Sequence, residues 1–454
     1  MTIEAEPYWF SGNFCPLEEE VTAFDLPVTG SVPESLSGRV LRIGPNRLST
    51  TDPTLHHWMM GEGMVHGVRL REGRAAWYRN RWVRSPHVAR FEGEPVRPGP
   101  QIPLSVLPDG EAAPNTNIVS HAGRTLALLE GGLARPYELT YELETCGPTD
   151  LGGTLPEGYT AHPKRDPATG DLHGMSWNAF WGPKVQYTVI GSDGLVRHVA
   201  DIPIGGPSVV HETSITEKYV LVYDLPMVID LNELLVTGMP IKYTDDYTPR
   251  VGILPLYGTA DDVRWFDVNP CAMYHALNAF DDGDQVVVDV CRHPGESPTP
   301  LGFGEGFATL DRWTFDLTSG KTLEERIDDR PQEFPRVDER EVGRRHTVGW
   351  TAALGPIGGF APGGTLVKHN MAARTSEARD FGAGTAVSEP LFVPASADAA
   401  PGDGWVLDYV YDEARGATDL YILNAADFCG DPAAVVHLPV RVPHTFHGNW
   451  CPDE

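Results

Sequence analysis

The chain has 454 residues, of which 35 are basic and 63 acidic, and its formal net charge is −28 at pH 7. This charge argues against nucleic acid as a partner and against electrostatic docking on an anionic membrane, although it leaves room for weak membrane contact through an apolar patch. No apolar run reaches transmembrane length, and the acidic N-terminus has no secretion-signal pattern.

The six cysteines are scattered and form no CxxC motif, which is typical of reduced thiols in a cytoplasmic protein. A chain of this length has room for about three ordinary domains, yet no Ser/Gly-rich or single-charge linker divides it. Its 48 glycines and 40 prolines are spread between many short β-rich runs. This distribution predicts an all-β chain with many turns, and we expect a single domain over residues 1–454.

Residues 1–35 are expected to form a lead-in segment. The first clear strand is predicted at residues 77–84, where apolar and polar residues alternate. A hairpin follows, with strands at 118–120 and 124–129 and with Glu130 at its end. Further strands are expected at about residues 186–190, 196–202, 219–224, 285–290, 310–316, 405–411 and 419–424. Helical pattern is scarce, and the best candidate is residues 231–238.

Four single histidines each stand beside a turn and a short strand; they are His162, His211, His275 and His447. Taken alone, each is more typical of a hydrogen-bonded histidine in the core or at its rim than of a metal ligand. None is paired with another at the i, i+4 spacing of a helical metal site. Four lone histidines at four distant strand ends suit a closed, radial β fold whose inner edges converge on an axis.

Several motifs accompany these histidines in a characteristic order. They are residues 38–46 (GRVLRIGPN), 57–66 (HWMMGEGMVH), 80–84 (NRWVR), 333–336 (EFPR) and 388–393 (SEPLFV). Together they resemble the carotenoid cleavage oxygenases, a family of non-haem iron enzymes that split conjugated double bonds, and most of all its actinobacterial members. Because no strict repeat is visible, the resemblance alone implies a seven-bladed β-propeller with a cap of loops and short helices over one face. It also implies a lid or entrance at about residues 227–250, for which an ordinary cap helix is the alternative.

The resemblance further implies that His162, His211, His275 and His447 bind Fe(II). Neutral imidazole suits iron, zinc and copper, and four histidines on an octahedral iron leave two positions free, one of them for O2. His57 and His66 lie in a motif that we interpret as structural. Of His444 and His447, only His447 matches the ligand motif.

By motif, Glu130, Glu333 and Glu389 are expected to accept hydrogen bonds from the outer ring nitrogens of the ligand histidines. On sequence alone, each would be a solvated charge at a strand end. Thr116 matches a position near the open iron site in the family.

The substrate divides the family. Stilbene-cleaving members carry a lysine just before the first orienting glutamate and a tyrosine upstream; here that position is Leu129, and no matching tyrosine lies between Arg90 and Asn115. This favours an apolar polyene, a carotenoid or apocarotenoid, cleaved with O2 to two aldehyde or ketone products. Stilbene or phenylpropenoid (vinyl-phenol) cleavage is the alternative, and a metal-free propeller that only binds a partner is another. The sequence leaves the oligomeric state open.

Overall fold

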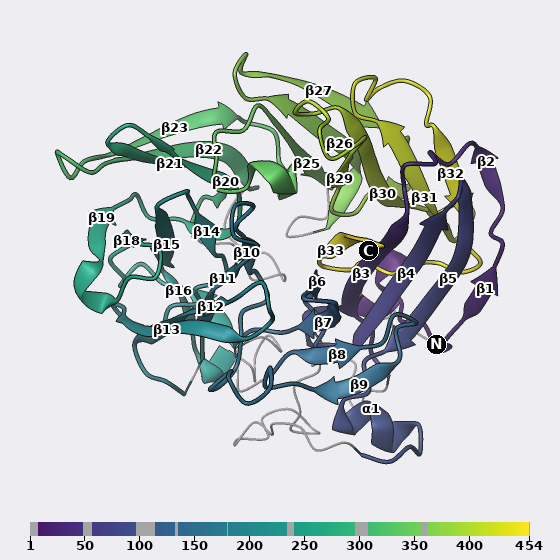
Figure 1. Ribbon diagram of the computed structural model, residues 1–454, viewed down its shortest axis with the longest axis horizontal. Helices are drawn as coiled ribbons and strands as arrows, with labels where there is room; N and C mark the ends of the chain where they lie inside the picture. Colours follow the sequence, from purple (N-terminus) through teal and green to yellow (C-terminus); the bar gives the residue numbers. More distant parts are fainter. Residues whose placement is uncertain are drawn as a thin grey trace, which may run out of the picture.

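The computed structural model describes residues 8–48, 57–96, 114–131, 135–178, 180–233, 240–295, 307–355 and 361–453. Within these residues, seven antiparallel sheets stand side by side around a central axis, and the fold is a seven-bladed β-propeller (Figure 1). The predicted fold class is therefore confirmed.

Five of the blades are each built from four strands in chain order, and four of these five use consecutive strands. The blade that follows α1 (Pro86–Phe91) comprises β6 (Asn117–His121), β7 (Arg124–Leu128), β8 (Tyr137–Leu139) and β9 (Thr145–Pro148). The next comprises β10 (Lys164–Arg165), β11 (Leu172–Trp177), β12 (Lys184–Ile190) and β13 (Val196–Pro203). Then come β14 (Ser214–Ile215), β15 (Tyr219–Asp224), β18 (Arg250–Pro255) and β19 (Arg264–Asp267). They are followed by β20 (Ala272–Asp282), β21 (Gln285–His293), β22 (Thr309–Asp316) and β23 (Thr322–Asp328). The fifth comprises β24 (Gln332–Val337), β25 (Val348–Leu354), β26 (Pro362–Asn370) and β27 (Thr375–Asp380).

The two remaining blades join the ends of the chain. One has the order β1 (Thr22–Phe24), β5 (Arg74–Trp82), β4 (Gly63–Arg71), β3 (Gly38–Pro45) and β33 (Gly448–Pro452). The other places β2 (Val28–Gly30) beside β32 (Ala434–His437), followed by β31 (Ala417–Asn424), β30 (Gly404–Asp412) and the short strands β28 (Thr385–Ala386) and β29 (Leu391–Pro394).

The expectation of a mere lead-in at residues 1–35 was wrong for β1 and β2. Both strands pair antiparallel with the outer strands of blades, at β5 and β32. Because β3 also pairs with the C-terminal β33, hydrogen bonds between the two ends of the chain close the ring. These pairings cover strand edges that would otherwise be open to other chains.

The predicted strands are all present, with bounds that differ by a few residues. Strands in the middle of a blade were harder to predict where they are buried on both faces and do not alternate. Every residue of β3 and of β11 is buried, whereas the outer strand β27 contains only half-buried and exposed residues. Apolar side chains from neighbouring blades fill the space between them, as Leu221 and Ile253 do against Val288 and Trp313.

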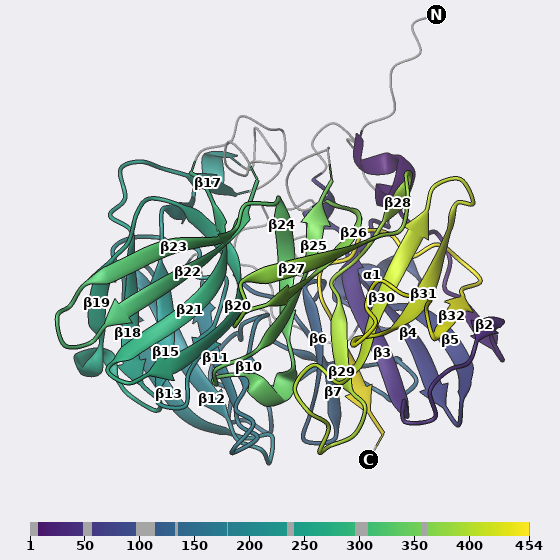
Figure 2. The same ribbon diagram turned by 90° about the horizontal axis from the view of Figure 1, so that it is seen from above.

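One rim of the propeller carries short helices and loops (Figure 2). Among them are η1 (Tyr8–Phe10), η2 (Gly12–Phe14) and the hairpin of β16 (Met227–Ile229) and β17 (Ile241–Tyr243). The predicted helix at residues 231–238 is helical at residues 231–233, and its remaining residues lie outside the described part of the chain. Among the described residues, no helix is long and apolar enough to cross a membrane.

Candidate metal centre

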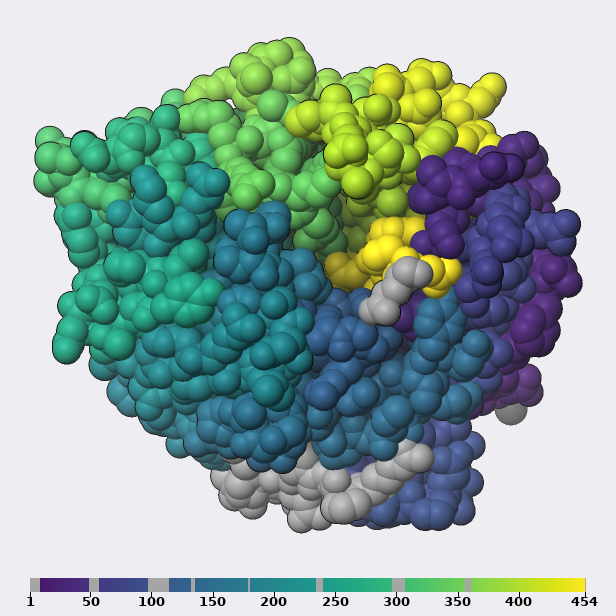
Figure 3. All heavy atoms as spheres, in the orientation of Figure 1, coloured from purple at the N-terminus to yellow at the C-terminus, as the bar shows by residue number. Residues whose placement is uncertain are grey.

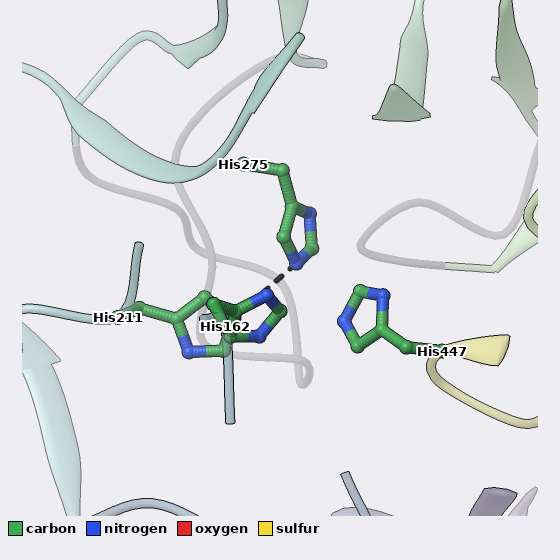
Figure 4. A group of neighbouring side chains, drawn as sticks. All are labelled: His162, His211, His275 and His447. Atoms are coloured by element: carbon green, nitrogen blue, oxygen red, sulfur yellow. Dashed lines mark hydrogen bonds between the residues drawn. The ribbon is translucent and has the colours of Figure 1, made fainter. Parts of the chain in front are cut away.

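The four single histidines meet at the centre of the propeller (Figure 4). Each offers one ring nitrogen, and these nitrogens all lie within 4.8 Å of one another. His162, His211 and His447 stand just before β10, β14 and β33, and His275 lies within β20, so four different blades contribute. Pairing of β20 with β21 is irregular between Met273 and Ala276, at the position of His275. Such an irregularity re-aims a side chain, in this case toward the axis.

The geometry of the four rings fits a metal ion. The Nε2 atoms of His211 and His275 are 3.2 Å apart, and the rings of His162 and His211 have centroids 4.1 Å apart. Nε2 of His162 is buried and has no hydrogen-bond partner among the residues that the structure describes. A buried polar atom without a partner is costly, and a cation held between the four rings would satisfy it. Four neutral nitrogen donors suit iron, zinc or copper.

Burial keeps two of these rings neutral. It lowers the pKa of His162 well below its ordinary value, and the charges of the neighbouring histidines and Lys164 act in the same direction. Burial likewise lowers the pKa of His447 to about 4. For His275, burial also lowers the pKa, but the charge and hydrogen bond of Glu333 outweigh it and raise the pKa overall. The same negative charge around His275 also favours a metal cation between the four histidines.

Each of the three predicted glutamates contacts one of these histidines through its outer ring nitrogen. Nδ1 of His275 lies 2.6 Å from Glu333 Oε2, and Nδ1 of His447 lies 2.9 Å from Glu389 Oε1. Nδ1 of His211 is hydrogen-bonded to Glu130. A carboxylate that accepts the Nδ1 proton leaves the Nε2 lone pair free for a metal. Among the described residues, no carboxylate contacts His162.

A second set of residues supports the glutamates, and sequence reasoning missed it. Nε1 of Trp177 donates to Glu130 at 3.2 Å, and Nε2 of His293 lies 3.0 Å from Glu333. Arg336 makes an ion pair of 3.3 Å with Glu389. Only Arg336 carried a sequence signal, because it belongs to the motif at residues 333–336.

These partners decide the charge of the buried carboxylates. Burial alone would raise the pKa of Glu333, but the charges and hydrogen bonds of His275 and His293 lower it to about 2. The pKa of Glu389 is lowered further still: burial raises it, and Arg336, His447 and Arg42 outweigh the burial. Both carboxylates are therefore ionised at neutral pH.

The other histidines of the motifs lie elsewhere. His66 is hydrogen-bonded to the hydroxyl of Tyr78 at 2.9 Å between β4 and β5, and His57 caps η4 (Trp58–Met60). The ring of His444 packs on Phe14. Thr116 accepts the backbone N–H of His447 through its carbonyl oxygen at 3.2 Å, and its role near an open iron site stays a prediction.

A polar cavity reaches the histidines along the axis. His162, His275 and His447 lie in its wall together with Asn117, Lys164 and Glu212. Figure 3 shows the face of the propeller opposite η1 and η2, which is hollowed near its middle beside the C-terminal segment drawn in yellow. The polar lining suits water or a hydrated ion rather than an apolar chain.

Comparison with known proteins places this geometry among oxygenases. The family model described as retinal pigment epithelial membrane protein matches residues 14–452. A carotenoid cleavage oxygenase from Mycobacterium tuberculosis is 39% identical, over 99% of this chain and 98% of its own length. An isoeugenol monooxygenase from Pseudomonas nitroreducens is 28% identical, over 97% of both chains.

Solved structures agree with these sequence matches. The lignostilbene dioxygenase of Pseudomonas brassicacearum superposes with a TM-score of 0.88 at 30% identity and covers 99% of both chains. Two forms of Synechocystis apocarotenoid oxygenase, a variant and a cobalt-substituted form, have TM-scores of 0.85 and 0.84 at 25% identity and cover 96% of this chain and 97% of their own.

Proposed function

The chain belongs to the carotenoid cleavage oxygenase family of non-haem iron enzymes, and we propose that it cleaves a conjugated C=C bond of a carotenoid or apocarotenoid with Fe(II) and O2. Two aldehyde or ketone products would result, with one oxygen atom of O2 in each. The proposed ligands of the iron are His162, His211, His275 and His447. The observation that carries the proposal is the convergence of four ring nitrogens, from three buried histidines and the half-buried His211, within 4.8 Å of one another.

The protein's own groups would perform two tasks at the metal centre. The four histidines hold the ion, and Glu130, Glu333 and Glu389 fix the ring orientations by accepting Nδ1–H. A bound Fe(II) ion would supply the activation of O2 for attack on the electron-rich polyene.

Aromatic side chains beside the histidines would exclude water and contact an apolar substrate. The ring of Phe334 lies 5.6 Å from that of His275 and 5.7 Å from that of His447. Its backbone φ is +54°, which is strained for a bulky residue, and Glu333 stabilises this conformation by accepting the N–H of Phe334 at 2.7 Å. Tyr274 packs edge-on against His211 at 5.5 Å.

Product analysis tests the reaction. The purified protein is expected to contain about one iron per chain and to give two carbonyl products from a polyene. With isotope-labelled O2, both carbonyl oxygens are expected to carry the label. Label in only one product would contradict the dioxygenase reaction, and a protein that binds no metal would favour the propeller that only binds a partner.

We predict that apocarotenals are cleaved faster than hydroxystilbenes. The position before Glu130 is Leu129, which cannot form a hydrogen bond with a phenol. A buried hydroxyl without a partner costs about 1–3 kcal/mol, which corresponds to a rate lower by about 5–150-fold. Stilbene or phenylpropenoid cleavage is the second candidate, because an isoeugenol monooxygenase and a lignostilbene dioxygenase are among the relatives. A side-by-side assay in which hydroxystilbenes or vinyl-phenols turn over and apocarotenals of several lengths do not would replace the first candidate with the second.

The variant Leu129→Lys sharpens that assay. Leu129 is half-buried, and an ammonium group held out of water beside an apolar substrate costs several kcal/mol unless it neutralises, so cleavage of the apocarotenal should fall. Leu129→Met is the matched control, since it keeps the volume and the apolar character.

Several expectations from the sequence stay predictions. They are the O2 and apolar polyene partners, the cytoplasmic location, the weak membrane contact, the single domain over residues 1–454 and the lid at about 227–250.

A further inference from the structure

Glu212 follows His211 directly and is buried, with 1% of its surface exposed. Its carboxylate accepts two backbone hydrogen bonds, from the N–H of Thr213 to Oε1 at 2.8 Å and from the N–H of Ala276 to Oε2 at 3.0 Å. Lys164 completes the set through an ion pair of 2.9 Å with Oε1. Both oxygens of this carboxylate are therefore engaged.

The three partners come from three segments that each carry a candidate ligand. Lys164 stands two residues after His162, Thr213 two residues after His211, and Ala276 one residue after His275. The pairing of β20 with β21 is irregular around Ala276. The backbone N–H of Ala276 therefore needs a hydrogen-bond acceptor outside the sheet, and Glu212 supplies it. One side chain thus joins three of the four blades that contribute to the centre.

We propose that Glu212 is a positioning residue of the metal centre and sets the spacing between His162, His211 and His275. It differs in this from Glu130, Glu333 and Glu389, each of which orients a single ring through Nδ1. The inference rests on the proposed metal site, but it needs neither the identity of the substrate nor that of the reaction.

The chemistry of the three contacts requires a carboxylate. Two N–H groups and an ammonium group all donate, and an ionised carboxylate offers two oxygens that only accept. A glutamine offers one oxygen and an NH2 group, so Glu212→Gln would place its NH2 against one of the donors. Lys164 would also lose its countercharge. The backbone near His211 or His275 would then shift, and the nitrogen atoms would no longer fit one ion together.

Binding of Co²⁺ to the full-length chain after removal of its metal tests the proposal without any turnover. Visible absorption of bound Co²⁺ reports the ligand geometry, and competition with a chelator reports the affinity. For Glu212→Gln we expect an affinity lower by about tenfold, at the lower end of the effect of outer-sphere partners, together with an altered Co²⁺ spectrum. Glu212→Asp, which keeps both oxygens on a shorter stem, should lie between the two.

Two further variants separate positioning from simple stability. Asp224→Asn is the matched control: Asp224 is fully buried and binds the N–H of Gly205 and the guanidinium of Arg250. It should lower thermal stability and leave the Co²⁺ spectrum unchanged. Lys164→Met removes only the ion pair. Because Lys164 is half-buried, this variant should still fold, and it should lower the Co²⁺ affinity by less than Glu212→Gln does.

Two results would overturn the inference. One is a Glu212→Gln protein with the wild-type Co²⁺ affinity and spectrum. The other is a pair of Glu212→Gln and Asp224→Asn proteins that both lose stability and both keep the wild-type spectrum. In either case the metal site itself stands, because the wild type binds Co²⁺; a wild type that binds no Co²⁺ would instead remove the metal site and the proposed function together.

Discussion

Replacing His211 by alanine is expected to remove almost all metal from the purified protein and almost all of its oxygenase activity. The change deletes one of four converging nitrogens and leaves the carboxylate of Glu130 without its imidazole partner. Loss of a hydrogen-bond partner behind a ligand already lowers metal affinity by 10–100-fold, so loss of the ligand itself should exceed about 100-fold. Elemental analysis and chelator competition measure this directly.

His66→Ala is the matched control for that experiment. His66 is more deeply buried than the candidate ligands, with 1% of its surface exposed, and its hydrogen bond to Tyr78 lies outside the group of four. Its loss should destabilise the fold by about 1–3 kcal/mol and leave the metal content at about one per chain. If His211→Ala kept the wild-type iron content and turnover, the ligand assignment would be wrong.

The sequence predicted those parts of the fold that repeat a local pattern. Hairpins such as that of β6 and β7 have strands that alternate apolar and polar residues, or have typical turn residues between them. They could therefore be placed to within a few residues. Strand β3 could not be predicted by alternation, since all eight of its residues are buried. The role of β1 and β2 depends on pairing with strands far along the chain, and local sequence carries no trace of such partners.

The short helix α1 was missed although its signals were present. Ser85 caps its first turn by accepting the N–H of Val88, and Pro86 occupies the first helical position. Ser-Pro before an apolar residue is typical of a helix start. The helix has only six residues, however, which is too short for an amphipathic pattern to be recognised.

At the candidate metal centre, motif matching found the histidines and glutamates but not the pairs that they form. The contact between His275 and Glu333 spans 58 residues, and that between His447 and Glu389 also spans 58. Closure of the propeller brings these residues together, and no local spacing predicts which carboxylate meets which ring. Glu212 illustrates the limit best, because on sequence alone it is one acid beside a histidine.

Among the three orienting carboxylates, Glu333 is expected to show the largest effect when it is replaced by glutamine. It is fully buried, and it accepts from His275, from His293 and from the N–H of Phe334. Its pKa of about 2 means that it carries a full negative charge at neutral pH. Glu130 is less enclosed, with 14% of its side chain exposed, so water can replace part of what glutamine loses there.

The variant Glu333→Gln keeps the shape of the side chain but removes the charge and one acceptor. Three donors then face one oxygen and one NH2 group, so either the ring of His275 or that of His293 must turn away. We expect metal affinity to fall by about 10–100-fold, and by more than in Glu130→Gln, as chelator competition would measure. Glu62→Gln is the control, because Glu62 is also buried but accepts the N–H of Leu48, outside the group of four histidines. Equal affinities in the Glu333→Gln, Glu130→Gln and wild-type proteins would mean that the carboxylates only fill space behind the rings, and the imidazole orientation would then have to come from the backbone of the four blades alone.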